Sequence, residues 1–284
     1  MWSSLVEYQR PQRLDHALRL LERQKPRSVP LAGGAWLVAQ RDQSIEAVVD
    51  LSALNLTFIK TSARRLRLGA MTTLQTMAQD SVIQNLAGGL LRDASNRYAP
   101  RSVRNVATIG GTIVVGNPTS EVCLALLVLD ALVIIRKPTE YVVPLDAFFV
   151  NPTMHLPSSG LITEIEIPRP SASVGATIAE VSRTPNDQPI VNAAALVSRV
   201  GHICRTARLA LGGIASHPIR LPDIEAAISL HKIDESVLTQ AADAISSSIN
   251  PPSDARTSSE YRRKMAGIVV ARALRQAWEQ TERE

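Results

Sequence analysis

The chain has 284 residues, of which 45% are hydrophobic and 20% charged, and its net charge is +5. At roughly 100–200 residues per domain, this length predicts two domains. The modest and interspersed positive charge gives no sign of a nucleic-acid-binding surface. The only two cysteines, Cys123 and Cys204, are too few for an iron–sulfur cluster or a disulfide framework and suit a reducing compartment.

No signal peptide or membrane span is expected. The amino terminus shows no basic region followed by an apolar core. The longest apolar run, 122–135, is short for a bilayer and contains Asp130. We therefore expect a cytoplasmic protein; the alternative is export of the folded complex on a signal carried by a partner.

The predicted elements begin with a helix in which Leu14, Ala17, Leu18 and Leu21 recur at helical spacing before Pro26. A strand over 29–32 then leads into the glycine doublet Gly33-Gly34. Further short strands are expected at 47–51, 56–59 and 65–69. Thr72 or Thr73 can cap the next helix, with Gly88-Gly89 near its end.

The second half of the chain predicts more strands and then helices. The apolar, β-prone run 107–113 predicts a strand ending at Gly110-Gly111, and a buried helix over 121–129 feeds a strand over 131–136. A strand over 161–167 closes at Pro168, and 168–173 reads as a linker. Three strands and three helices then predict an α+β unit. They are expected at 176–182, 190–200, 203–211, 222–231, 235–248 and 258–282.

The two glycine doublets carry the functional hypothesis. Glycine permits positive φ and has no Cβ, so successive N–H groups can converge on an anion. Two such turns can hold the two halves of a pyrophosphate, which suggests a dinucleotide cofactor. The alternative, a pair of ordinary tight turns, stays open for each doublet alone, and Gly212-Gly213 reads as such a turn.

A turn-rich stretch, 116–121, opens the helix that follows the second doublet, and a helix start favours anions and hydroxyl groups. Glu121 there is read either as a carboxylate that complements the helix dipole or as a ligand contact. Other common site motifs are missing from the sequence. It has no Gly-x-Gly-x-x-Gly fingerprint, no P-loop, no His-Glu-x-x-His and no Gly-x-Ser-x-Gly.

The runs 32–37 and 101–112 resemble the two flavin loops of the molybdenum hydroxylase flavoproteins. These are the FAD-binding medium subunits of aerobic carbon monoxide dehydrogenase and the FAD domain of xanthine dehydrogenase. The resemblance continues through 117–121 and 161–168. In the last third it includes 181–183 with Asp187, 207–215 and 259–263, so it covers essentially the whole chain.

The resemblance implies an α+β fold, with a two-subdomain, PCMH-like FAD-binding domain followed by a small α+β C-terminal domain built of a three-stranded sheet plus helices. The FAD-binding domain would span 1–172, with subdomains of about 1–54 and 55–172. The C-terminal domain would span 173–284.

The resemblance also implies which residues bind FAD. Loop 32–37 would wrap one phosphate and the ribityl chain, loop 108–112 would bind the other phosphate through N–H groups, and three single positions would complete the site. The implied cofactor-binding residues are Ala32, Gly33, Gly34, Ala35, Trp36, Leu37, Tyr98, Thr108, Ile109, Gly110, Gly111, Thr112, Glu121 and Ile162. Tyr98 reads equally well as a core tyrosine.

This chain departs from the family pattern at four of these positions. Thr112 replaces the usual Asn, Glu121 replaces Asp, and Ala35-Trp36 replaces Thr-Asp or Thr-Ser. Glu121 would bond the sugar hydroxyls, Ile162 would pack near the flavin ring or adenine, and Trp36 could offer an indole face. A bulkier residue at Gly33 or Gly111 is expected to cost flavin occupancy more than folding.

The function implied is that of the FAD-binding electron-transfer subunit of a multi-subunit molybdenum hydroxylase, an oxidoreductase. No catalytic or metal-binding residue is assigned in this chain. An iron–sulfur small subunit would carry two [2Fe-2S] clusters, a large subunit would carry the molybdopterin cofactor, and the complex would be a dimer of heterotrimers. The alternative is an assembly subunit that has lost tight flavin binding. A stand-alone flavin reductase is disfavoured, because no nicotinamide motif is seen.

Overall fold

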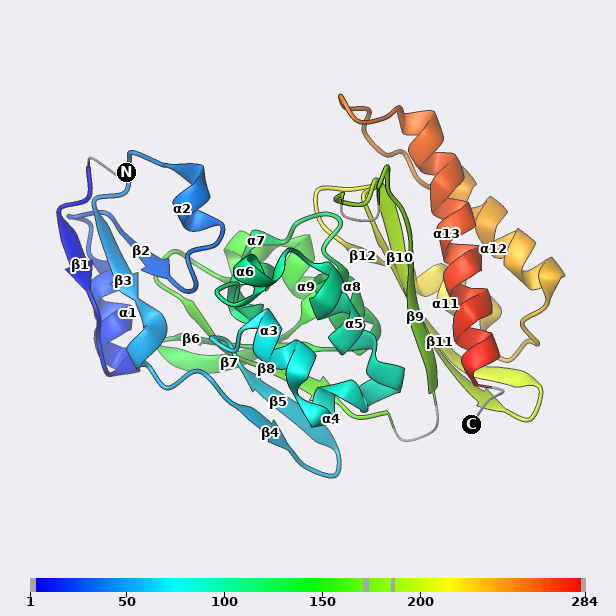
Figure 1. Cartoon of the computed structure of the whole chain (residues 1–284), viewed down its shortest axis with the longest axis horizontal. Coiled ribbons are helices and arrows are strands. Elements are labelled where there is room, and N and C mark those ends of the chain that lie inside the picture. Colours follow the sequence, from blue (N-terminus) through cyan, green and yellow to red (C-terminus); the bar gives the residue numbers. More distant parts are fainter. Residues whose placement is uncertain (1–3, 171–173, 185–186, 282–284) are drawn as a thin grey trace. The chain divides into compact units, whose positions relative to one another are not determined.

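The computed structural model describes residues 4–170, 174–184 and 187–281, which fold into two compact units (Figure 1). Unit 1 consists of the described residues of Met1–Met77, Pro100–Val115 and Ala131–Ile167. Unit 2 consists of those of Ala78–Ala99, Gly116–Asp130 and Pro168–Glu284. Unit 2 thus combines two segments from the first half of the chain with the C-terminal part. The division at residue 172 stays a prediction.

Unit 1 begins with a small parallel sheet in the order β1-β3-β2. The helix α1 buries Ala17, Leu18 and Leu21 against Val49 of β3, which is the apolar face expected from the sequence. A fully buried leucine stabilises a fold by roughly 1.5–3 kcal/mol, so this face anchors the sheet. The elements are β1 Glu7–Gln9, α1 Leu14–Glu22, β2 Ser28–Leu31, α2 Leu37–Gln40 and β3 Ala47–Asp50.

A five-stranded sheet in the order β4-β5-β8-β6-β7 forms the rest of unit 1, with short helices between its strands. Ile59 of β4 pairs with Leu68 of β5, and Val133 of β6 pairs with Ile165 of β8, both antiparallel. The elements are β4 Ile59–Thr61, β5 Arg65–Gly69, α3 Leu74–Gln79, α6 Arg101–Arg104, α7 Ile109–Val115, β6 Leu132–Lys137, β7 Thr139–Pro144, α9 Leu145–Val150, α10 Pro152–His155 and β8 Leu161–Pro168.

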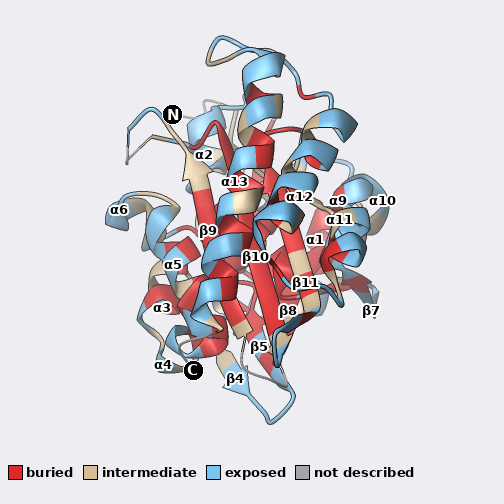
Figure 2. Cartoon of the chain, turned by 90° about the vertical axis from the view of Figure 1, so that its right-hand side faces the viewer, coloured by how far each residue is buried: buried red, intermediate tan, exposed pale blue. Residues whose placement is uncertain are grey.

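Unit 2 is built on an antiparallel sheet in the order β12-β11-β10-β9, with helices on both faces. The helices α11–α13 share one hydrophobic core with β10 and β11, and Figure 2 shows these strands largely buried while α12 and α13 expose their outer sides. Helix α8 contacts β10 and β11, and α5 contacts α8. The elements are α4 Ser81–Gln84, α5 Leu90–Arg97, α8 Glu121–Val128, β9 Val174–Val181, β10 Val191–Val200, β11 Ile203–Gly212, β12 Ile219–Arg220, α11 Pro222–Ile228, α12 Glu235–Ser248 and α13 Ser259–Gln280.

The three strands and three helices expected after the linker are present as β9–β11 and α11–α13. The sheet has a fourth strand, β12, which the sequence did not predict because it is only two residues long. Short elements in unit 1 were also missed, among them β1, β7, α2 and α6. Their sequences are too short to show a hydrophobic period.

One prediction about the second glycine doublet is wrong, because Gly110 and Gly111 lie in the first turn of helix α7 and not at the end of a strand. The run is rich in β-branched residues, which favours a strand locally. The hydroxyl Oγ1 of Thr108 instead accepts a hydrogen bond from Gly111 N at 3.2 Å, and Ile109 and Ile113 are buried. Tertiary packing and this helix-start hydrogen bond outweigh the local preference.

Helix α8 is buried over its whole length, and its first residue, Glu121, is only 6% exposed. Ser120 caps the helix by accepting a hydrogen bond from Cys123 N. Burial raises the pKa of the Glu121 carboxyl to about 7, because the charged form loses hydration. Its own backbone N–H lowers this pKa, nearby Glu180 raises it, and Arg97 lowers it.

This burial predicts a pH-dependent stability. Because the folded pKa lies above the ordinary carboxyl value of 4.5, the contribution of Glu121 is present below pH 4.5 and is lost as the pH rises to about 7. The loss amounts to about 3 kcal/mol at most. Urea unfolding of the FAD-free chain should therefore show Glu121→Gln gaining stability over the wild type between pH 4.5 and pH 8. A difference between the two proteins that stays constant over this range would contradict the assignment.

Candidate functional site

The first glycine loop follows β2 directly and turns into the short helix α2. Gly34 has φ +73°, a conformation that favours glycine. Within the described part of the chain, the N–H groups of residues 33–37 have no hydrogen-bond acceptor, whereas Val38 N donates to Gly34 O at 3.1 Å. Five consecutive residues thus keep main-chain donors available to a ligand.

Gly33 is where this loop meets the second one. A Cβ atom added at Gly33 would lie 1.5 Å from the carbonyl O of Val106, so only glycine allows this approach. The structure therefore changes the expectation for Gly33. Its missing side chain makes room for the chain's own backbone, and a substitution there acts on folding as well as on any ligand.

The second loop uses its N–H groups within the protein. Ile109 N donates to Thr72 O at 3.0 Å, Gly110 N to Ala70 O at 2.9 Å and Thr112 N to Thr108 O at 2.9 Å. The Thr112 hydroxyl also donates to Thr108 O, at 2.9 Å. These bonds fix α7 against the start of α3 and the end of β5. Sequence reasoning could not distinguish these occupied donors from the open ones of the first loop.

The two loops form one surface in unit 1. A Cβ at Gly111 would meet Thr108 Oγ1 at 3.0 Å and Ala32 Cβ at 4.0 Å, and no other atom within 4 Å lies outside its neighbours and its own helix. The open donors of the first loop thus lie beside a nearly free glycine of the second loop. A phosphate group, which accepts several N–H hydrogen bonds, fits this donor set.

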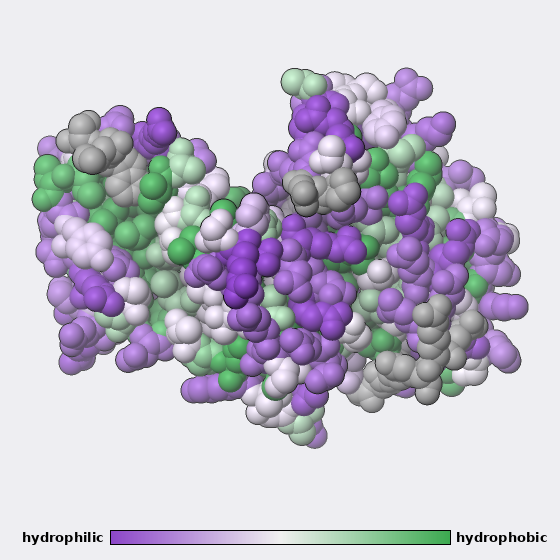
Figure 3. Space-filling view, viewed as in Figure 1, coloured by the Kyte–Doolittle hydropathy of each residue, from purple (hydrophilic) through white to green (hydrophobic). Residues whose placement is uncertain are grey.

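Apolar side chains surround the first loop. Trp36 is 51% exposed and Val38 58% exposed, and Val106 of the second loop is also exposed. Figure 3 shows hydrophobic surface over this part of unit 1, around β1, β2, β3 and α2. A flat aromatic ligand beside the phosphate donors would cover such groups.

Arginines of α6 were not singled out from the sequence. Arg101 and Arg104 lie in this short helix, which ends two residues before Val106, and Arg104 Nε donates to Gln75 Oε1 at 3.1 Å. Arg101 is exposed. Two arginines nine and six residues before a glycine doublet are a signal in the sequence, since guanidinium groups offset the charge of a diphosphate.

The remaining residues implied by the resemblance lie elsewhere in the fold. Ile162 is buried in β8 of unit 1, at 5% exposure. Tyr98 follows α5 in unit 2 and is partly buried, and Glu121 begins α8 in unit 2. The resemblance alone assigns these three residues to the cofactor, and the assignment stays a prediction.

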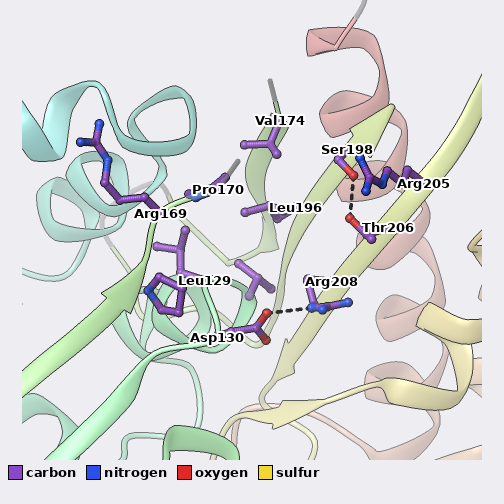
Figure 4. Close-up of a pocket in the computed structure, with 12 residues that line it drawn as sticks. Leu129, Asp130, Arg169, Pro170, Val174, Leu196, Ser198, Arg205, Thr206 and Arg208 are labelled. Atoms are coloured by element: carbon purple, nitrogen blue, oxygen red, sulfur yellow. Dashed lines mark hydrogen bonds and ion pairs between the residues drawn. The ribbon is translucent and has the colours of Figure 1, made fainter. Parts of the chain in front are cut away.

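A cavity of about 300 Å³ lies in unit 2, and no residue of the predicted site is among those that line it (Figure 4). Its lining includes Leu129, Leu196, Ser198, Arg205, Thr206 and Arg208. Arg208 is paired with Asp130 at 2.9 Å, and the hydroxyls of Ser198 and Thr206 bond each other at 2.6 Å. Among residues 4–170, 174–184 and 187–281, no group of three or more His, Cys, Asp or Glu side chains is placed to hold a metal ion.

Two known protein families match this chain. The family described as "FAD binding domain in molybdopterin dehydrogenase" matches residues 4–170. The family described as "CO dehydrogenase flavoprotein C-terminal domain" matches residues 176–277. Among the described residues, no helix combines the length and apolar character that a membrane span requires.

Individual relatives agree with both families over nearly the whole chain. The glyceraldehyde dehydrogenase medium chain of Sulfolobus acidocaldarius is 29% identical, and the alignment covers 97% of this chain and 99% of the relative. The structure of carbon monoxide dehydrogenase from Hydrogenophaga pseudoflava matches with a TM-score of 0.91 and 28% identity, covering 97% of this chain and 98% of that one. Quinoline 2-oxidoreductase from Pseudomonas putida 86 matches with a TM-score of 0.88 and 25% identity, over 99% of both chains.

These matches confirm the predicted fold class, an FAD-binding domain followed by an α+β C-terminal domain. They also confirm the resemblance on which the sequence analysis relied, and with it the assignment as an oxidoreductase component. The chain belongs to the FAD-binding medium subunits of the molybdenum hydroxylase family.

Proposed function

We propose that this chain binds one FAD and passes electrons from the iron–sulfur clusters of a partner subunit to an external acceptor. The observation that carries the proposal is the open set of main-chain donors at residues 33–37, beside Gly111. Such donors bind a diphosphate without needing a charged side chain. The family match to an FAD-binding domain supports the identity of the ligand.

The protein's own contribution is binding and placement. The N–H groups of residues 33–37 would hold the diphosphate, with Thr108–Thr112 forming the neighbouring wall. Trp36 would cover an aromatic part of the cofactor, and Arg101 and Arg104 would offset its negative charge. Tyr98, Glu121 and Ile162 are proposed as further contacts by resemblance. When bound, FAD supplies the ability to accept electrons singly and to release them.

The names of the relatives support a role for partner subunits, because several of these relatives are called medium chains or subunits. We infer a small subunit with two [2Fe-2S] clusters and a large subunit with the molybdopterin cofactor, assembled as a cytoplasmic dimer of heterotrimers. The oxidation of the organic or gaseous substrate would take place in the large subunit. This division of labour agrees with the lack of a catalytic motif in the present sequence.

The second candidate is an assembly subunit that keeps the fold but not the flavin. Two observations favour this candidate. Ala35 and Trp36 bring no hydroxyl to the first loop. The N–H groups of Ile109, Gly110 and Thr112 already donate to carbonyl groups of the chain. The five open donors of the first loop argue against it, because consecutive main-chain N–H groups beside a glycine form an anion-binding set.

FAD binding is the first test. The complex purified through this chain should show flavin absorbance bands together with iron and molybdenum. Saturating FAD should raise the apparent melting temperature of the FAD-free chain by roughly 5 °C or more, since the ligand binds only the native state. A folded chain that shows neither the absorbance nor the shift would support the assembly subunit instead.

A pair of glycine substitutions separates folding from binding. Gly33→Ala should destabilise the chain by about 1–3 kcal/mol, because its methyl group would meet the Val106 carbonyl. Gly111→Ala should leave the melting temperature nearly unchanged, since the methyl group meets only the Thr108 hydroxyl. Gly111→Ala should weaken FAD binding by at least about tenfold, because its methyl group would keep the phosphate oxygens from the N–H groups of residues 33–37.

Thermal unfolding and FAD titration of both variants check this. The matched control is Gly201→Ala, at a hairpin glycine with nothing within 4 Å of an added Cβ and φ +60°, which should affect stability alone. Unchanged FAD affinity in folded Gly111→Ala would show that the second loop does not contact FAD.

A further inference from the structure

The third glycine doublet, Gly212-Gly213 at the end of β11, packs closely against another segment of the chain and is more than a turn. A Cβ at Gly212 would lie 2.6 Å from Pro118 O. Gly213 has φ +82°, and its N–H donates to the same carbonyl at 2.9 Å. The doublet therefore brings the end of the C-terminal sheet against the segment that precedes α8.

Asn192 holds this segment from the neighbouring strand. It pairs with Gly212 in the β10–β11 register and is fully buried. Its Nδ2 donates to Thr119 O at 2.9 Å, whereas its Oδ1 has no partner. A buried acceptor without a partner costs about 1–3 kcal/mol, so Asn192 is a poor choice for stability alone.

Two further side chains, those of Gln188 and Arg262, bond the same segment or the strand ends beside it. Gln188 Nε2 donates to Asn117 Oδ1 at 2.9 Å and to Thr119 Oγ1 at 3.0 Å. Arg262 of α13 is buried and donates to Gly213 O at 2.7 Å and to Ile190 O at 2.9 Å. Arg262 thereby fixes the start of β10 and the end of β11, whose residues contact the segment before α8. Its Nη2 forms an ion pair with Asp254 Oδ2 at 2.6 Å.

The segment held in this way leads straight into Glu121. Asn117 O accepts from Ser120 N at 2.9 Å, Ser120 caps α8, and Glu121 is the first residue of that helix. The charged groups that act on its carboxyl are Arg97 of α5 and Glu180 of β9, which pair with each other at 3.4 Å. Cys123 follows on α8, and Arg272 of α13 contacts Glu180 O.

We propose that Gln188, Asn192, Gly213 and Arg262, here called the clamp, position the segment 117–120 so that the Glu121 carboxyl is held for its cofactor contact. The proposal rests on the proposed function, in which Glu121 contacts FAD. The clamp residues are positioning residues that act through Glu121.

The physical reason is the narrow range of a hydrogen bond. A carboxylate must lie within about 2.5–3.0 Å of a hydroxyl oxygen to bond it. The position of the Glu121 carboxyl depends on the main chain of residues 117–120. Gln188, Asn192 and the N–H of Gly213 bond this segment directly, and Arg262 acts on it through Gly213 O. Removing the Asn192 amide leaves Thr119 O unpaired, and removing the Gln188 amide takes one donor from Asn117 Oδ1 and from Thr119 Oγ1. Either change lets the first turn of α8 shift.

The test is a double-mutant cycle in the full chain. Asn192→Leu, close in volume, removes the donor together with the unpartnered acceptor; it leaves Thr119 O unpaired, a cost of about 1–3 kcal/mol that urea unfolding measures alongside FAD binding. The exposed Gln188→Ala provides a second variant that does not depend on repacking. Each should weaken FAD binding by about 5–20-fold when Glu121 is present and by less than about twofold in the Glu121→Gln background.

The pH dependence of FAD affinity is a second measurement, because a general loss of stability does not change the pH at which the affinity shows its inflection. The wild type should show an inflection near pH 7 from Glu121. Asn192→Leu should shift it toward the ordinary carboxyl value of 4.5. Ser198→Ala is the matched control, because it removes a buried hydrogen bond from the same strand without touching 117–121.

Three results would overturn the clamp: unchanged FAD affinity and inflection in folded Asn192→Leu, equal weakening in both backgrounds, or no effect of Glu121→Gln on FAD binding. In each case the wild type still binds FAD, so the proposed function stands. Failure of the wild-type chain to bind FAD would overturn the proposed function and the clamp together.

Discussion

The candidate site depends on one close approach between two backbone segments of unit 1. Gly33 lies so near the Val106 carbonyl that a methyl group would overlap it. This contact joins the loop after β2 to the loop before α7, although more than 70 residues separate them in sequence. Within the described residues, the N–H groups of 33–37 have no acceptor in the protein, so the loop that makes this contact also carries the open donors.

The two glycine loops have different roles. In the first loop the main-chain donors are open, so it can bind an anion. In the second, Ile109, Gly110 and Thr112 bond Thr72, Ala70 and Thr108 and so make a rigid wall. A site with one open donor set and one internally bonded wall places a diphosphate with little loss of entropy in the wall, since the wall is ordered before the ligand arrives.

Sequence patterns predicted the larger elements well. The apolar spacing of α1 and α13 and the alternation of β8 and β11 all extend over several periods, which makes them readable. The second doublet was assigned to a strand because its β-branched residues favour one. It is helical because Thr108 bonds the start of the helix and because Thr72 and Ala70, distant in sequence, accept from Ile109 and Gly110. Elements of two to four residues, such as β12 and α2, carry no period at all.

The site could be predicted only in part, for a similar reason. Glycine pairs in the sequence indicate where the backbone bends or approaches another group, but they do not tell a ligand from the protein itself. Gly33 meets Val106, Gly212 meets Pro118, and Gly111 faces little within the chain. Resemblance to the flavoprotein family supplied the identity of the ligand, which the residues alone left open.

The central claim is that the first loop binds the diphosphate of FAD through its main chain, and hydrogen exchange at individual amides tests it most directly. Comparison of the FAD-bound and FAD-free chain should show strong new protection at residues 33–37. Residues 109, 110 and 112, whose amides are already bonded, should change little. Protection that appears elsewhere while 33–37 exchange as fast as before would contradict the account.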